Sequence, residues 1–311
     1  MAKRGHSVTI EPMQSADLNL LRRMPVVSGI FYPDAEEALK ECLESWGLKE
    51  GSTRTSLSKQ TPGGRVLIAP HGAWDLSGEI AAAAFASLQA ELGEGKRQGG
   101  LHDVQRVILI GPCHSYWHGW EHGESGVYLS ESSSFQTPIG DLTVDRRTNR
   151  TMTSSSTLVQ ENDIFHLSEH SIEVLLPMVK FCMPSVKIIP ILVQDSSPPV
   201  VAALARVLRM LANDNIEHSI IIVSSNISAS CDKAQALTMA ENFSVVLPAT
   251  DADAFSAELS AGRINACGGA IISALFESGL LAGKRFSAIS PLSTATDEDG
   301  YIVYYRAFVA R

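Results

Sequence analysis

The chain has 311 residues, of which 45% are hydrophobic, and its 34 acidic and 25 basic side chains give a formal net charge of −9. This length suits one large α/β domain or two small ones, and the apolar fraction is sufficient for a sizeable core. The acidic balance disfavours nucleic-acid and membrane-surface binding, and no apolar run is long enough to span a bilayer, so we expect no nucleic-acid or membrane partner.

Helical patterns and short apolar runs alternate through the first part of the chain. Pro33 and Asp34 mark a helix start, and Pro70 ends an apolar run typical of a buried strand. The predicted elements are a helix over 33–46, a strand over 65–70, a helix over 77–92, a strand over 105–112 and an amphipathic helix over 169–182 that contains Pro177.

The same alternation continues to the end of the chain. Continuous apolar strands separated by helices are typical of a parallel sheet that is covered on both faces. The predicted fold class is therefore α/β, a single three-layer α/β/α domain with a largely parallel central sheet. The remaining predicted elements are strands over 186–193, 218–225, 286–293 and 301–310 and helices over 200–212, 251–262 and 268–283.

Three of the predicted strands end directly before polar residues. The strand over 65–70 precedes His71, the strand over 105–112 precedes His114 by one residue, and the strand over 218–225 precedes Asn226. In such sheets, functional groups collect beyond the carboxyl ends of the strands. Two histidines at one edge favour a metal or proton-transfer site over the alternative of two turn histidines bonded to the backbone.

His114 also begins a second pattern, because His114, His118 and His122 are spaced by four residues. On a helix this spacing would place all three on one face. Gly119 and Gly123 argue against a regular helix here. We therefore expect a loop in which His118 lines a pocket and only His114 is a ligand.

The segment "HLSEH" (166–170) matches the inverted zinc-peptidase motif, in which His166 and His170 bind the metal and Glu169 is the base. That motif needs a long helix on both sides, and Pro177 shortens the helix downstream. The alternative is a helix N-terminus, where the helix dipole favours an acidic residue. On such a helix His170 and Glu173 share a face and can point into a pocket.

Five cysteines without a CxxC pair indicate a reducing compartment, and residues 1–21 lack the apolar core of a secretory signal, so we expect a cytoplasmic protein. Cys267 is distinctive because it lies beside glycines, directly before a predicted helix. A helix N-terminus lowers the pKa of a thiol and makes it a better ligand. The alternative is a buried, inert cysteine.

Six stretches, in chain order between about residues 24 and 283, together resemble the Memo family, and "EHSIE" combined with "TPIGD" is the most specific part. The resemblance predicts an N-terminal extension over 1–23 and a Memo-like α/β domain over 24–311. The stretches are "MPVVSGIFYP", "IAPHGAWDLSGEIAAAAFASL", "VILIGPCHS", "FQTPIGDLTVD", "HLSEHSIEVLLP" and "INACGGAIISAL".

The Memo family resembles the class III extradiol dioxygenases, which use a non-haem iron. The resemblance implies that His71, His114 and Cys267 bind a redox metal, iron or copper, and these donors also suit zinc. The predicted cleft is lined by Asn226, His118 and Glu173.

This chain departs from the family pattern after the fourth strand. The family typically has "SSDFSH" or "SSDFCH", whereas this chain has "SSNISAS", with Asn226 in place of the acid and Ala229 in place of the histidine. A histidine in that region is the acid–base catalyst of the related dioxygenases. Its replacement argues against efficient ring opening and leaves His170, or His118, as the candidate catalytic residue.

Two functions are compatible with these features. The first is a metal-dependent redox or metal-handling protein. The second is a non-enzymatic signalling module that binds a peptide or small ligand in the same cleft, because the resemblance also implies adaptors for phosphotyrosine peptides. A phosphate site needs basic side chains at its rim, for which Arg146, Arg147 and Arg263 are the candidates.

Overall fold

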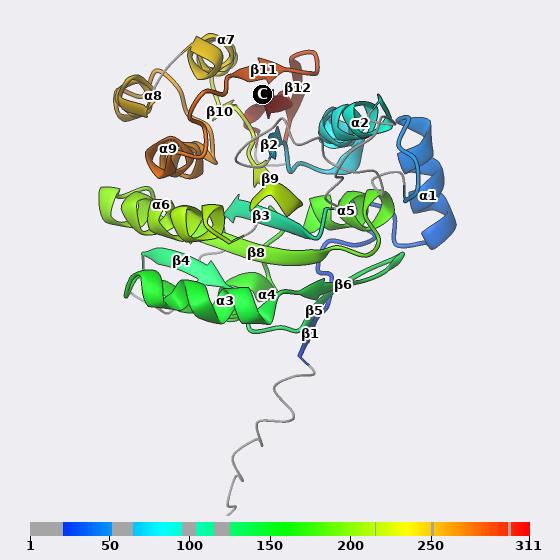
Figure 1. Ribbon diagram of the computed structural model, residues 1–311. Coiled ribbons are helices and arrows are strands. Elements are labelled where there is room, and N and C mark those ends of the chain that lie inside the picture. Colours follow the sequence, from blue (N-terminus) through cyan, green and yellow to red (C-terminus); the bar gives the residue numbers. More distant parts are fainter. Residues whose placement is uncertain are drawn as a thin grey trace, which may run out of the picture.

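The computed structural model describes residues 21–51, 65–94 (90–94 as backbone only), 104–114, 125–214, 216–249, 252–297 and 300–311. They form a central sheet with helices on both sides (Figure 1). The predictions made for His118 and His122 lie outside these residues. Within them, no helix has the length and apolar character needed to cross a membrane.

The middle of the sheet is parallel, as predicted, and this confirms the fold class. Strands β3 (Arg106–Pro112), β9 (Ser219–Ser224) and β2 (Arg65–Ala69) lie side by side, and β8 (Lys187–Gln194) pairs with the other edge of β3. Shorter strands extend both ends of the sheet. These are β14 (Phe308–Ala310) and β11 (Phe286–Ala288) beyond β2, and β6 (Gly140–Val144), β5 (Ser134–Thr137), β1 (Arg22–Arg23), β4 (Gly126–Leu129) and β7 (Val159–Glu161) beyond β8.

Successive side chains of each central strand enter different core layers. Leu67 and Leu109 pack on one face, while Ile68 and Ile108 pack on the other, and all four are fully buried. This explains why these strands read as continuous apolar runs. The first face is covered by α1 (Glu36–Ser45), η3 (Trp74–Gly78), α2 (Glu79–Glu94) and α5 (Leu176–Cys182), and the second by α6 (Pro198–Ala212), α7 (Lys233–Ala249), α8 (Ala252–Ser260) and α9 (Gly269–Ser278) (Figure 1).

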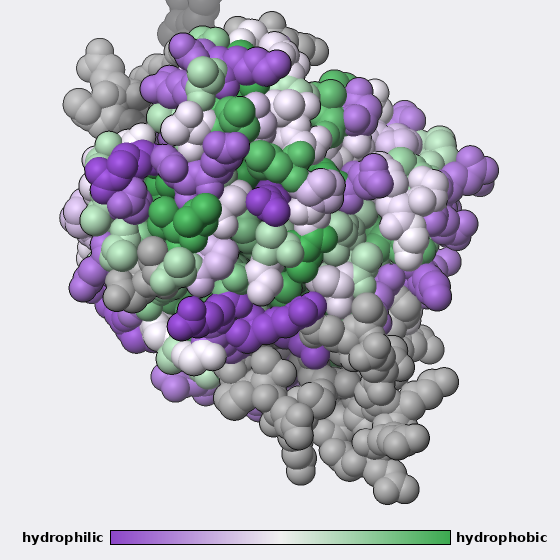
Figure 2. Space-filling view, turned by 90° about the horizontal axis from the view of Figure 1, so that it is seen from above, coloured by the Kyte–Doolittle hydropathy of each residue, from purple (hydrophilic) through white to green (hydrophobic). Residues whose placement is uncertain are grey.

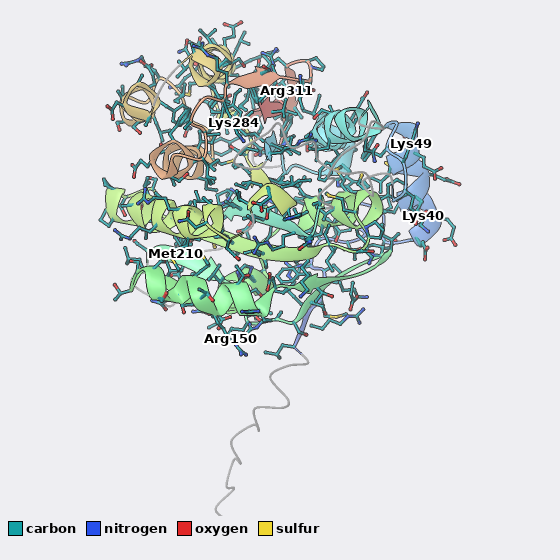
Figure 3. All side chains as sticks on the ribbon, viewed as in Figure 1. Lys40, Lys49, Arg150, Met210, Lys284 and Arg311 are labelled. Atoms are coloured by element: carbon teal, nitrogen blue, oxygen red, sulfur yellow. The ribbon has the colours of Figure 1, made fainter. Side chains whose placement is uncertain are left out.

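Charged side chains lie on the outside of these layers. Lys49 follows α1, and Arg150 belongs to α3 (Arg146–Met152); both are exposed at the molecular surface (Figure 3). On the face seen from above, hydrophobic residues are scattered among hydrophilic ones (Figure 2). The apolar side chains therefore gather mainly in the two core layers.

The helix predicted over 169–182 does not form as expected. Glu169 and His170 lie in a loop after α4 (Ile164–Leu167), followed by the 3-10 turn η5 (Glu173–Leu175) and then by α5. Pro177 lies in the first turn of α5, where its missing N–H costs no helical hydrogen bond. Pro177 thus starts a helix rather than interrupting one.

Helix α7 was not predicted. Its buried residues, Ala236, Ala240, Phe243 and Leu247, share one face, but the exposed Leu237 and Val245 obscure this pattern in the sequence.

Glu173 does not line a cleft, which corrects the prediction. Its side chain is 1% exposed and forms an ion pair with Arg23. It also accepts hydrogen bonds from the Tyr32 hydroxyl and from the backbone N–H groups of Val26 and Val27, each at 2.9 Å. Glu173 turns away from His170 because no regular helix joins them. It anchors the chain between β1 and α1 instead.

This anchor predicts a large stability loss in Glu173→Gln. The substitution leaves the buried Arg23 without a counter-charge, so the free energy of unfolding should fall by ~3–5 kcal/mol in urea titrations. The matched control is Arg22→Ala, because the Arg22–Asp141 pair is 45% and 36% exposed and should contribute little. Equal small losses in both variants would contradict the assignment.

Candidate metal centre

Three side chains that are distant in the sequence meet at the carboxyl edge of the parallel sheet. His71 follows β2 and His114 follows β3, on either side of β9, and Cys267 lies in the loop before α9. One ligand atom from each residue lies within 4.8 Å of the other two. The predicted convergence of His71, His114 and Cys267 is confirmed, and their role as metal ligands is taken up below.

His71 is held in one tautomer by a chain of hydrogen bonds. The Ser224 hydroxyl donates to the Ser171 carbonyl at 2.5 Å, and His71 Nδ1 lies 2.7 Å from Ser224 Oγ. Because the Ser224 proton is already engaged, Oγ accepts from Nδ1–H. The other nitrogen, Nε2, therefore has a free lone pair and faces Cys267 Sγ at 3.4 Å.

His114 is oriented in the same way by a carboxylate. Its Nδ1 lies 3.1 Å from Glu169 Oε1, and an ionised carboxylate can only accept, so Nδ1 carries the proton. Glu169 also accepts from the backbone N–H groups of His114 and Ser171. Burial opposes the charge, but the bonds and the positive charge of His114 hold the pKa of Glu169 well below its usual range. The second nitrogen of His114, Nε2, is left for the cluster.

Cys267 reaches the cluster because its loop packs closely on the end of β9. A Cβ on Gly268 would lie 2.6 Å from Ser225 Cβ, so a residue with a side chain could not approach this closely. Asn226 joins two of the site residues: its N–H donates to Cys267 Sγ at 3.0 Å, and its Oδ1 accepts from His71 N–H at 3.1 Å. Asn226 therefore bonds to two of the three site residues, and its place in the lining of a cleft stays a prediction.

His170 also lies at this site. Its ring centroid is 5.8 Å from that of His71 and 5.2 Å from that of His114, and its Nδ1 is 3.4 Å from Glu169 Oε1. Burial and the nearby imidazole of His71 lower the pKa of His170 to about 4, so His170 is neutral at pH 7. His170 is therefore a neutral imidazole beside two of the proposed ligands, and its catalytic role stays a prediction.

His166 is not part of this group. It is 1% exposed, and its Nε2 lies 3.1 Å from the Tyr128 carbonyl. The ligand groups that the described residues form are His71–His114–Cys267 and His114–Glu169–His170, and neither includes His166. The inverted zinc-peptidase interpretation of "HLSEH" is therefore wrong, because the motif lies on a short helix and a loop.

The family model described as Memo-like protein matches residues 23–300. This chain belongs to the Memo-like family. A MEMO1 family protein of Thermotoga neapolitana is 28% identical over 89% of this chain and 93% of its own length. Others, from Thermotoga petrophila (30%) and Saccharolobus islandicus (27%), are matched over 66% of this chain and 69% of their own length. An uncharacterized Escherichia coli K12 protein of known crystal structure aligns over 79% of this chain and 98% of its own at 11% identity, with a TM-score of 0.49, too low to bear on function.

Cys267 and His114 carry opposite charges and form a pair at this site. Removal from water would raise the pKa of the Cys267 thiol, but the interactions of the thiolate with the neighbouring imidazoles of His71 and His114 lower it to about 5. Burial would lower the pKa of His114, but its bonds to Cys267 and Glu169 raise it to about 10. Without a metal, the site is therefore a thiolate beside an imidazolium.

This charge pair predicts an acid-shifted reactivity of Cys267. In metal-free protein carrying Cys231→Ser, which removes the other exposed thiol, iodoacetamide should alkylate Cys267 with a midpoint near pH 5. His71→Gln and His114→Gln each remove an imidazole whose interaction with Cys267 lowers the pKa of the thiol, so the midpoint should move to higher pH. A midpoint near that of a free thiol, ~8.5, in the unsubstituted site would contradict the pairing.

Proposed function

We propose that this Memo-like protein binds one transition metal through His71 Nε2, His114 Nε2 and Cys267 Sγ. The observation that carries the proposal is the state of the donors: both Nδ1 atoms are bound elsewhere as N–H donors, which leaves both Nε2 atoms for the metal. Ligands bound at ~2.0–2.3 Å lie ~3–4 Å apart, and the 3.4 Å between His71 Nε2 and Cys267 Sγ fits this range.

The donor set favours particular metals. Two imidazoles and a thiolate suit iron, copper or zinc better than magnesium or calcium. Asn226 stands where the family typically has an acid, so the site carries less negative charge. By resemblance to the family, we expect the metal to be iron(II) or copper(I). When bound, such a metal would supply redox chemistry, while Glu169 and Ser224 hold the two imidazoles in place.

We propose a redox or metal-handling role rather than efficient ring opening. Ala229 lies in β10 (Ser228–Ser230), and a methyl group cannot move a proton. The Ser228 hydroxyl donates to the Ala236 carbonyl at 2.8 Å, and Ser230 Oγ donates to Gln235 Oε1 at 2.7 Å. Among the described residues beside the proposed metal, His170 is the neutral base that remains.

The alternative of a phosphopeptide-binding module receives no support at this site. Arg146 pairs with Glu161, and Arg263 pairs with Glu258. Arg147 lines a different cavity, at the amino ends of β3 and β8. The three candidate cations are therefore engaged or placed elsewhere.

All five cysteines are free, which agrees with the reducing, cytoplasmic location that we propose.

Metal binding should follow the donor set. The protein purified without chelator and reloaded anaerobically should bind one iron or copper per chain, measured by elemental analysis. His71→Ala should abolish binding, and Ser224→Ala, which frees Nδ1 of His71, should weaken it ~10–100-fold. His218→Ala removes a histidine from the opposite edge of the sheet and is the matched control. Undiminished loading in His71→Ala, or stoichiometric calcium or magnesium with no transition metal, would contradict the proposal.

Extradiol turnover should be low or absent. Iron(II)-loaded protein given oxygen and a panel of catechols should show little ring-fission absorbance, because loss of an acid–base group typically lowers the rate ~10²–10⁴-fold. Fast turnover that disappears in His170→Ala would identify His170 as a competent base. Fast turnover that survives this substitution would refute the argument from Ala229.

A further inference from the structure

A cavity of about 540 Å³ opens beside the proposed metal ligands, with His114 and Cys267 in its lining. It lies at the carboxyl ends of β3 and β8, and residues of α7, α8 and α9 contribute to its lining. Its volume is in the range of small-molecule sites, ~300–1,000 Å³. A ligand in this cavity would contact the metal centre from one side.

Apolar surface makes up slightly more than half of the cavity wall. Apolar side chains come from five different elements or loops: Val193, Met239, Leu259, Ile264 and Ile271. None of the described residues in the lining is a lysine or an arginine. The imidazolium of His114 is the cation of this wall, and it is already paired with Glu169 and Cys267. Such a wall suits an aliphatic or aromatic ligand body.

Asp195 is the one carboxylate among the described residues that line the cavity. It has a φ of +82°, and it is the one non-glycine residue with a positive φ among those described. Left-handed backbone at a non-glycine residue is uncommon and concentrates at ligand sites. Asp195 Oδ1 accepts from Ser196 N–H at 2.6 Å and from Ser197 N–H at 3.2 Å, and these bonds fix the carboxylate at the cavity rim.

Asp195 is exposed, and its carboxylate also forms hydrogen bonds with the side chains of Ser197 and Ser125. Asparagine would make the same bonds to Ser196 and Ser197 and tolerates the same backbone conformation. A carboxylate at the edge of an apolar cavity carries a formal negative charge that no lysine or arginine in the described lining neutralises. This charge is available to a cationic ligand group.

We propose that the cavity binds a small molecule with an apolar body and a primary ammonium group. The ammonium pairs with Asp195, the body lies against Met239, Leu259 and Ile271, and the far end lies beside His114 and Cys267. This assignment rests on the proposed function only for that last contact, because the cavity and Asp195 exist without a metal. The ligands proposed for the metal site are therefore amines whose apolar end lies beside His114 and Cys267.

The test uses 2-phenylethylamine and 3-phenylpropionate, which have similar bodies and opposite charges. Isothermal titration of the metal-free full chain should show the amine binding about 2- to 5-fold more tightly than the acid, as expected for an ion pair with an exposed carboxylate. Asp195→Asn, which retains the turn, should abolish this preference. Asp253→Asn on α8 removes an exposed acid outside the lining and should leave the preference unchanged.

Three results would overturn the inference: no binding of 2-phenylethylamine, equal binding of both probes, or unchanged amine binding in Asp195→Asn. Metal loading of the same preparations separates this inference from the metal proposal. If the amine binds and His71→Ala still loads metal fully, the metal proposal fails and the amine site stands. If metal loads as proposed and the amine does not bind, the amine site fails alone.

Discussion

Ser171 is the residue on which the geometry of the site depends. Its carbonyl accepts from Ser224, its N–H donates to Glu169 at 2.8 Å, and its hydroxyl donates to the Pro112 carbonyl at 2.7 Å. Ser224 and Glu169 in turn hold Nδ1 of the two histidines. Through Ser224 and Glu169, Ser171 therefore fixes the tautomers of His71 and His114. Its hydroxyl links the loop after α4 to the end of β3. Such outer hydrogen bonds orient metal ligands and tune their basicity.

The sheet makes this arrangement possible. Adjacent parallel strands end at one edge, so residues 71, 114 and 226 become neighbours although they are far apart in the chain. Close approach then depends on glycine: a Cβ on Gly111 would lie 2.5 Å from Ser171 Oγ. Two further hydrogen bonds hold the charges at this edge: Asn226 N–H donates to Cys267 Sγ, and the imidazolium of His114 donates to Glu169.

The sequence was sufficient for the parts of the site that follow strand geometry. His71 and His114 could be selected because each follows a continuous apolar strand, and Cys267 because it precedes a helix beside glycines. The roles of Ser171, Ser224 and Glu169 could not be predicted, since they depend on how a loop packs across two strand ends. The buried hydroxyl of Ser224 was the one available signal, because a polar group at the end of a buried strand needs a partner. Glu173 was misplaced because a helix was assumed where a 3-10 turn forms.

The most direct test of the account is X-ray absorption spectroscopy of the iron- or copper-loaded protein. The account predicts one sulfur ligand at ~2.3 Å and two imidazole nitrogens at ~2.0–2.1 Å, with the sulfur lost in Cys267→Ser. A metal bound by nitrogen and oxygen alone in the unsubstituted protein would contradict it, and would point instead to the group formed by His114, Glu169 and His170.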